Sequence, residues 1–282
     1  DDMAVRTYEA FVVKAEAAAA LSNLVPDEDT GGLPVPGSVP LTAAQVDKVW
    51  DGPGIAPLGL PEVEWLDEYP RCHLISTGYL FFSGYAPRGA WLDHDDSPGS
   101  WLSAANQPGP PAGTYSSNWQ FERHDGSAVL FPNLGGTYDQ ILRVGGADGF
   151  IGPTTDAVES FDAASTSSTW NSASAMPPTL ANVPDGGRVF ANLVILPTGD
   201  LLLVGGQYQG GSQIEKLLHP LLFTGGGWVP LTPNPIGSPR TYHSTAVLLP
   251  DGRVLLGGGD DRYYDYEIFS PPYLAVTANR PV

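Results

Sequence analysis

The chain has 282 residues, of which 42% are hydrophobic and 16% charged, so it can bury a core. With 31 acidic against 13 basic residues, its formal charge of −18 repels nucleic acids and anionic membranes and excludes both as main partners. The 34 glycines and 28 prolines favour a turn-rich β protein, and the single cysteine, Cys72, excludes a disulfide within the chain.

Residues 1–60 predict a helical and looped appendage, or an insertion between repeat units. Residues 5–24 contain an alanine run without Gly or Pro, which predicts a helix. Residues 26–40 are rich in Pro, Gly and acidic residues and predict a loop. Residues 42–52 predict a second, short helix.

Residues 61–282 predict a domain built from one repeated unit. Each copy has an apolar strand, a turn that contains glycine and a second apolar strand, and three of the copies end in a glycine pair. Because glycine has no Cβ, such pairs let a strand end come close to the ring axis. The four copies are residues 69–84, 126–146, 188–206 and 240–259.

A tryptophan motif follows these copies. Two further strands lead to Trp101, Trp170 and Trp228, so the complete unit has four strands. Units recur about every 50–60 residues, which is the length of a β-propeller blade. We expect each tryptophan to fill the wedge between neighbouring blades.

The closing stretch, RTYHSTAVLLPDGRVLLGGG followed by YEIFSPPYL and NRPV, resembles the galactose oxidase and glyoxal oxidase family of copper radical oxidases. The resemblance covers roughly residues 65–282 and is carried by kelch-type blades. It implies a seven-bladed propeller followed by an immunoglobulin-like sandwich. It also implies oxidation of an alcohol, carbohydrate or aldehyde by O2, with H2O2 as the second product.

The same resemblance implies a copper site near the ring axis. Tyr242 and His243 match the family's adjacent axial tyrosine and histidine ligands, and Phe190 matches an aromatic residue of the substrate pocket. Tyr242 is the expected base for the substrate hydroxyl proton, and His243 the expected copper ligand. Imidazole and phenolate donors suit Cu(II). For Tyr242 and His243 the alternative is a packed tyrosine and a histidine bonded to backbone.

The chain departs from the family in what it lacks. The four blades resemble the last four of the family's propeller, and neither the cross-linked tyrosine with its cysteine nor the second histidine of the sandwich is found. The prediction is therefore a second polypeptide, or a clipped piece of the same precursor, that supplies blades and the sandwich. The alternative is a small closed propeller of four or five blades.

Other residues near the first copy leave their roles open. Tyr69 precedes a strand but resembles the blade after the cross-linked tyrosine, and Cys72 is expected to be a small buried residue. Arg71 and His73 are placed either at the ring axis, in contact with substrate, or on the solvent face.

The function predicted is the propeller portion of an exported copper radical oxidase, extracellular or at the cell surface, as the acidic composition favours. The alternative is a catalytically inactive kelch propeller that binds protein or glycan, or a structural subunit of a surface assembly. Fold alone does not separate these readings, because propellers carry many functions.

Overall fold

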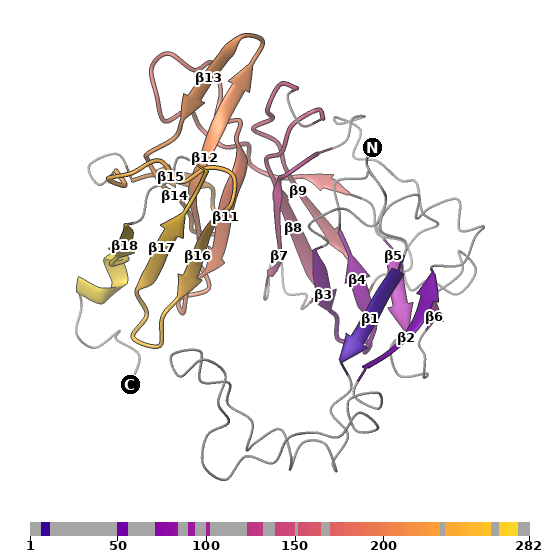
Figure 1. Ribbon diagram of the computed structural model, residues 1–282. Coiled ribbons are helices and arrows are strands. Elements are labelled where there is room, and N and C mark those ends of the chain that lie inside the picture. Colours follow the sequence, from indigo (N-terminus) through magenta and orange to yellow (C-terminus); the bar gives the residue numbers. More distant parts are fainter. Residues whose placement is uncertain are drawn as a thin grey trace, which may run out of the picture.

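The computed structural model describes residues 7–11, 50–55, 71–83, 90–93, 100–101, 123–131, 139–149, 152–164, 170–231, 235–260 and 265–275. Within these residues the fold is all-β, with four antiparallel sheets that follow one another along the chain and a separate two-stranded sheet (Figure 1). We call the four sheets blades 1 to 4. None of the helices among these residues is long and apolar enough to cross a membrane.

Each blade joins strands that are consecutive in sequence, as the repeat predicts. Blade 1 consists of β3 (Cys72–Leu74), β4 (Leu80–Phe82), β5 (Ala90–Asp93) and β6 (Ser100–Trp101). Blade 2 consists of β7 (Ser127–Phe131), β8 (Gln140–Val144), β9 (Val158–Asp162) and β10 (Asn171–Ser172). Blade 3 consists of β11 (Val189–Ile195), β12 (Leu201–Gly210), β14 (Leu221–Phe223) and β15 (Trp228–Pro230), and β13 (Gln213–Lys216) pairs with the end of β12.

Blade 4 shows three strands, β16 (Ser244–Leu248), β17 (Val254–Gly258) and β18 (Tyr266–Phe269), followed by the 3-10 helix η2 (Pro272–Ala275). The structure places the inner strands β7, β11 and β16 side by side, with β11 in contact with both of the others. These strands line the inner edge of the arc that blades 2 to 4 form (Figure 1).

The structure describes only two short segments of the N-terminal region. Residues Thr7–Phe11 form β1, which pairs with β2 (Trp50–Ile55), and the N-terminal helices stay a prediction. The segment TYEAF contains threonine, tyrosine and phenylalanine, residue types that favour a strand. The rest of residues 5–24 and 42–52, and the boundary near residue 60, lie outside the described residues.

The tight turns of the repeat confirm their prediction. In blades 1, 3 and 4 a glycine (Gly78, Gly199 or Gly252) closes the hairpin between the first two strands, with φ between +83° and +89°. Its N–H donates to the carbonyl three residues earlier, at 2.8–2.9 Å. Residues other than glycine rarely adopt this conformation, which explains the glycine at each turn.

The core lies between the blades rather than within one of them. Buried clusters join blade 1 to blade 2, blade 2 to blade 3 and blade 3 to blade 4. Trp170 packs against Phe161 in the first cluster, and Trp228 packs against Phe223 in the second. The Trp228 Nε1 donates to the Ser174 carbonyl of blade 2, so the predicted wedge role is confirmed for both tryptophans. The Trp101 side chain is outside the described residues.

Candidate active site

A buried arginine precedes the inner strand of blades 2, 3 and 4. These arginines are at most 1% exposed. Each donates to a glycine carbonyl in the glycine run at the end of its own blade's second strand, at distances of 2.7–3.2 Å. Burial lowers the pKa of Arg188 to about 9, so the folded blade bears a desolvation cost to hold it. The three pairs are Arg123 with Gly145, Arg188 with Gly205, and Arg240 with Gly258.

The glycine pairs also receive the backbone of the following blade. The N–H of Gly206 donates to the Arg240 carbonyl at 2.6 Å, and that of Gly146 donates to the Arg188 carbonyl at 2.9 Å. A Cβ on Gly205 would lie 2.4 Å from the Arg240 oxygen. The glycine pairs thus permit close approach of the next blade's arginine segment, whereas the expected approach to the ring axis stays a prediction.

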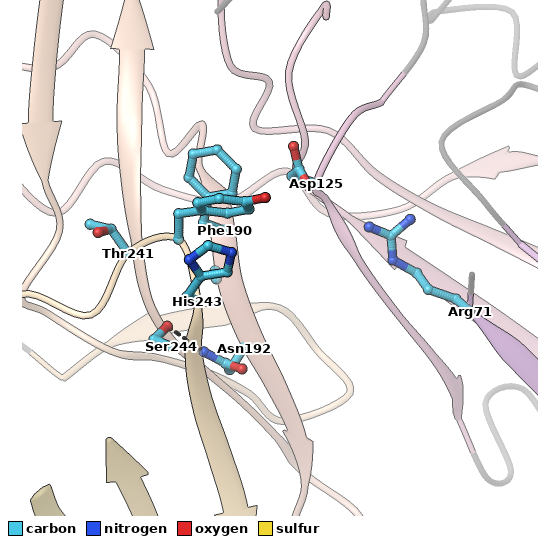
Figure 2. A pocket seen from close by; sticks show the side chains of 9 residues that line it. Arg71, Asp125, Phe190, Asn192, Thr241, His243 and Ser244 are labelled. Atoms are coloured by element: carbon cyan, nitrogen blue, oxygen red, sulfur yellow. Dashed lines mark hydrogen bonds between the residues drawn. The ribbon is translucent and has the colours of Figure 1, made fainter. Parts of the chain in front are cut away.

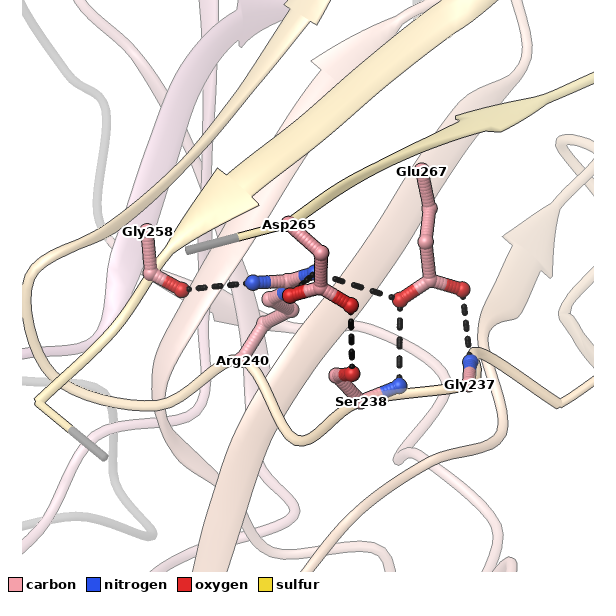
Figure 3. A network of polar contacts seen from close by, with 6 residues as sticks. All are labelled: Gly237, Ser238, Arg240, Gly258, Asp265 and Glu267. Atoms are coloured by element: carbon pink, nitrogen blue, oxygen red, sulfur yellow. Dashed lines mark hydrogen bonds and ion pairs between the residues drawn. The ribbon is translucent and has the colours of Figure 1, made fainter. Parts of the chain in front are cut away.

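Arg240 anchors the segment that leads into the candidate site (Figure 3). Its Nη2 lies 3.0 Å from Asp265 and 3.4 Å from Glu267, both at the start of blade 4's third strand. Glu267 also accepts the backbone N–H groups of Gly237 and Ser238, at 2.6 and 3.1 Å. The hydrogen bond from Ser238 and, after it, the one from Arg240 hold the pKa of Asp265 below its usual value.

Tyr242 and His243 occupy the centre of a tight turn, closed by the Ser244 N–H donating to the Thr241 carbonyl at 3.1 Å. Adjacent side chains on an extended strand point to opposite faces. His243 instead has φ of +60°, and its ring lies 3.8 Å from that of Tyr242, centroid to centroid. The turn therefore places the phenol and the imidazole on the same side of the chain.

The His243 imidazole is oriented by a carboxylate. Its Nδ1 lies 2.6 Å from Oδ1 of Asp260, and the Asp260 N–H donates to the Tyr242 carbonyl at 3.0 Å. With Nδ1 engaged, Nε2 is the ring nitrogen left for another group. A carboxylate on the far nitrogen is the usual support of a metal-binding histidine. Nothing in the sequence pattern pointed to Asp260 as the partner of His243.

Tyr242, His243 and Phe190 line one pocket of about 230 Å³ (Figure 2). The Phe190 ring contacts the Tyr242 ring with centroids 5.0 Å apart, so Tyr242 lies between Phe190 and His243. Asn192 of blade 3 donates to the Ser244 hydroxyl of blade 4 at 2.9 Å and ties the two walls together. The pocket is lined by Arg71, Asp125, Phe190, Ala191, Asn192, Thr241, Tyr242, His243 and Ser244.

The structure thus brings together the three residues predicted for the site, Tyr242, His243 and Phe190; their roles remain predictions. Of the two residues left open, Arg71 lines the pocket and His73 does not. His73 is buried, its Nε2 lies 2.7 Å from the Ser83 hydroxyl, and burial followed by the Arg71 charge lowers its pKa to about 4.

The prediction for Cys72 is wrong, because it is exposed. On β3 the buried His73 pairs with Phe81, which packs in the cluster between blades 1 and 2. Because neighbouring residues of a strand point to opposite faces, Cys72 and Leu74 lie on the face of blade 1 turned away from blade 2. Tyr69 lies outside the described residues.

The donors at the pocket suit copper but are few. Tyr242 offers a phenol oxygen and His243 an imidazole nitrogen whose partner nitrogen is already bonded. In the described part of the chain, no group of three or more His, Cys, Asp or Glu residues is placed to hold a metal ion. The residues present therefore fit one side of a copper site.

Comparisons with known proteins identify the family. Residues 125–281 match the family model described as glyoxal oxidase N-terminus. The chain is 32% identical over 245 residues to an aldehyde oxidase (GLOX) of Vitis pseudoreticulata, which covers 76% of this chain and 43% of the relative. It is 38% identical over 98 residues to a galactose oxidase of Gibberella zeae, covering 31% of this chain and 14% of the relative.

A solved structure, a fungal alcohol oxidase of the AA5 family in complex with copper, superimposes with a TM-score of 0.52 at 24% identity. The match covers 70% of this chain and 39% of that one, and it supports the fold. The chain thus spans less than half the length of the relatives it matches. Because the family model covers more than half of the chain, including all of the pocket except Arg71, the chain belongs to the glyoxal oxidase N-terminal family.

Proposed function

We propose that the chain is the propeller portion of an exported copper radical oxidase. The reaction is oxidation of a primary alcohol to an aldehyde, or of a hydrated aldehyde to an acid, with O2 reduced to H2O2. In each case the substrate loses two electrons and two protons, and O2 takes up both. The observation that carries the proposal is the Tyr242–His243 turn, with the imidazole oriented by Asp260 at 2.6 Å.

His243 and Tyr242 would hold copper through Nε2 and the phenol oxygen. Bound copper would supply the redox centre that accepts electrons from the substrate and delivers them to O2. Tyr242 receives the proton of the substrate hydroxyl, and the Phe190 ring holds the substrate carbon chain against it. Asp260 keeps the imidazole in one orientation, so little reorganisation is needed when copper binds.

The rest of the site comes, in this proposal, from a second polypeptide or a separate piece of the same precursor. That partner completes a seven-bladed ring and adds the sandwich with the second histidine. Two exposed apolar surfaces support the presence of such a partner. The outward face of blade 4 exposes Val247, Tyr266 and Ile268, at 49%, 69% and 41%, and blade 1 exposes Leu74 at 59%. Apolar sheet faces of this kind are normally covered.

The test is the copper content of the natively purified assembly, with intact masses and a peroxide assay. We expect about one copper per assembly, a second polypeptide and peroxide formed from an alcohol or aldehyde. Tyr242→Phe should lower kcat by about 10²–10⁴-fold, as expected for loss of a general base. Tyr208→Phe, which alters a tyrosine outside the pocket that packs with Val183 and Leu217, is the matched control and should leave kcat unchanged.

The second candidate is a propeller without catalysis that binds protein or glycan on this face. It is favoured by the finding that the described residues include no group of three or more His, Cys, Asp or Glu placed to hold a metal ion. A native assembly that contains no copper, and takes up none from Cu(II) in the presence of O2, would select this candidate over the oxidase.

A further inference from the structure

The buried arginines of blades 2 and 4 are paired with carboxylates. In blade 2, Nη1 of Arg123 lies 2.7 Å from Glu159. In blade 4, Nη2 of Arg240 lies 3.0 Å from Asp265 and 3.4 Å from Glu267 (Figure 3). Glu159 and Glu267 both lie on the third strand of their blades. Each of these two buried cations therefore has a counter-charge from its own sheet.

The corresponding arginine of blade 3, Arg188, has no such partner among the residues that the structure describes. Its side chain is buried, and its Nη1 donates to the Gly205 carbonyl at 3.2 Å, as Nη1 of Arg240 donates to Gly258. Its Nε and Nη2 are also buried, and neither donates a hydrogen bond to a described residue. The N–H of Nε and one N–H of Nη2 point in the same direction, so this edge of the guanidinium suits an acceptor that takes both.

The sheet register explains why the counter-charge is missing in blade 3. Glu159 and Glu267 pair with second-strand residues that lie two positions before the glycine contacted by the buried arginine. In blade 3 that second-strand position is Leu203, and it pairs with Leu221. Leu221 is buried and apolar, so it occupies the place of the glutamate without supplying its charge.

Arg188 needs a counter-charge from another source. Burial lowers its pKa to about 9, which still leaves the side chain cationic at neutral pH. A buried charge without a partner strongly destabilises a fold. The buried carboxylate of the neighbouring blade, Glu159, already accepts from Arg123 and Arg143. Because Arg188 is enclosed between strands, an ion from solvent has to be small, and a single-atom anion can accept from both N–H groups of the free edge.

We infer that Arg188 binds a small monovalent inorganic anion, with chloride as the expected ion, through its Nε and Nη2. The anion takes the part of the glutamate carboxylates of blades 2 and 4. The site is separate from the pocket, and it does not depend on copper. Its occupant stabilises the segment that leads to the pocket, because the Arg188 carbonyl accepts the Gly146 N–H at 2.9 Å and Phe190 follows two residues later.

The test measures urea unfolding of the native protein at constant sodium concentration while chloride replaces gluconate, which is too large for the site. Above the dissociation constant of one bound anion, each tenfold rise in chloride should raise the folding equilibrium constant about tenfold. Leu221→Glu supplies the missing carboxylate and should remove this dependence. Leu221→Met, which is uncharged and close to leucine in volume, is the matched control and should keep it.

Binding is measured directly from the line width of the chloride NMR signal. The native protein should broaden this signal, and added bromide should narrow it again by competing for the site. Arg188→Lys keeps the positive charge but loses the two parallel N–H groups, so it should weaken chloride binding about tenfold or more. The net charge of −18 repels anions from the surface, which favours the buried site as the source of the broadening.

Two results would overturn the inference. The first is a native protein whose unfolding is independent of chloride and which leaves the chloride signal sharp. The second is equal broadening by the native protein and by Arg188→Lys or Leu221→Glu, because the chloride would then bind elsewhere. Both measurements use the copper-free protein, so the anion site and the proposed oxidase can be refuted independently.

Discussion

Replacing Gly205 with alanine tests whether the glycine pair positions the active-site segment. Gly205 has φ of +73°, and its new Cβ would lie 2.4 Å from the Arg240 carbonyl oxygen. The matched control is Gly199→Ala, since Gly199 has φ of +83° but nothing within 4 Å of its Cβ position. Both substitutions impose the left-handed conformation, and only the first one adds a clash.

The expected magnitudes follow from these two contributions. The left-handed conformation costs about 1–2 kcal/mol at either position. Overpacking adds about 1–3 kcal/mol at Gly205, because the Arg240 backbone must move and its side chain is held by Gly258, at 3.0 Å, and by Asp265. Gly205→Ala should therefore destabilise the fold by about 2–5 kcal/mol, against about 1–2 kcal/mol for Gly199→Ala.

Urea unfolding followed by far-UV circular dichroism measures both free energies under the same conditions. Equal destabilisation by the two alanines would refute the reasoning, because it would mean that the Arg240 segment does not press on the glycine pair. A larger loss at Gly199 would refute it more strongly. Copper affinity should fall with Gly205→Ala alone, since that clash displaces the chain just before Tyr242.

Two further predictions concern buried charges. Glu159→Gln should lower the free energy of unfolding by about 3–5 kcal/mol, because Arg123 and Arg143 both lie 2.7 Å from the same buried Glu159 oxygen. Asp251→Asn, which breaks an exposed pair with Arg253, should cause no measurable change. Similar small effects in both variants would contradict this. The pKa of His73 is lowered from 6.5 to about 4, so the unfolded chain binds its proton more tightly. Stability should fall as the pH drops from 6.5 toward 4, by at most about 3 kcal/mol, and His73→Gln should remove this part of the pH dependence.

The blades were predictable because their signals are local. A turn glycine, an alternating strand and a glycine pair each lie within a few residues, and the structure places them as the repeat indicates. Tyr242, His243 and Phe190 were predicted from the family resemblance, and the structure brings them together in one pocket. The N-terminal strand was missed because Thr7–Phe11 pairs with Trp50–Ile55, and a partner some forty residues away leaves no trace in local composition.

Asp125, Arg71 and Asp260 could not be assigned from the sequence for a related reason. Asp125 and Arg71 line the pocket from different blades, and Asp260 reaches His243 from the segment after β17, so these surroundings exist only after the strands and blades have packed. Asp125 does carry one local signal, which is the arginine two residues before it. The same spacing separates Arg188 from Phe190, so aligning the blades on their buried arginines identifies the position.

That alignment also shows how one scaffold presents a tyrosine and a histidine together. Phe190 is two positions after Arg188, whereas His243 is three positions after Arg240. Phe190 and His243 nevertheless both come directly before the residue that pairs with a glycine of the neighbouring strand. The extra residue in blade 4 has to be accommodated, and the structure does so in the turn that Thr241 and Ser244 close. Tyr242 and His243 occupy that turn and project on the same side. The contacts between the arginines and the glycines do not involve the side chains of the turn. The fold therefore determines where the site lies, and the side chains at two or three positions determine its chemistry.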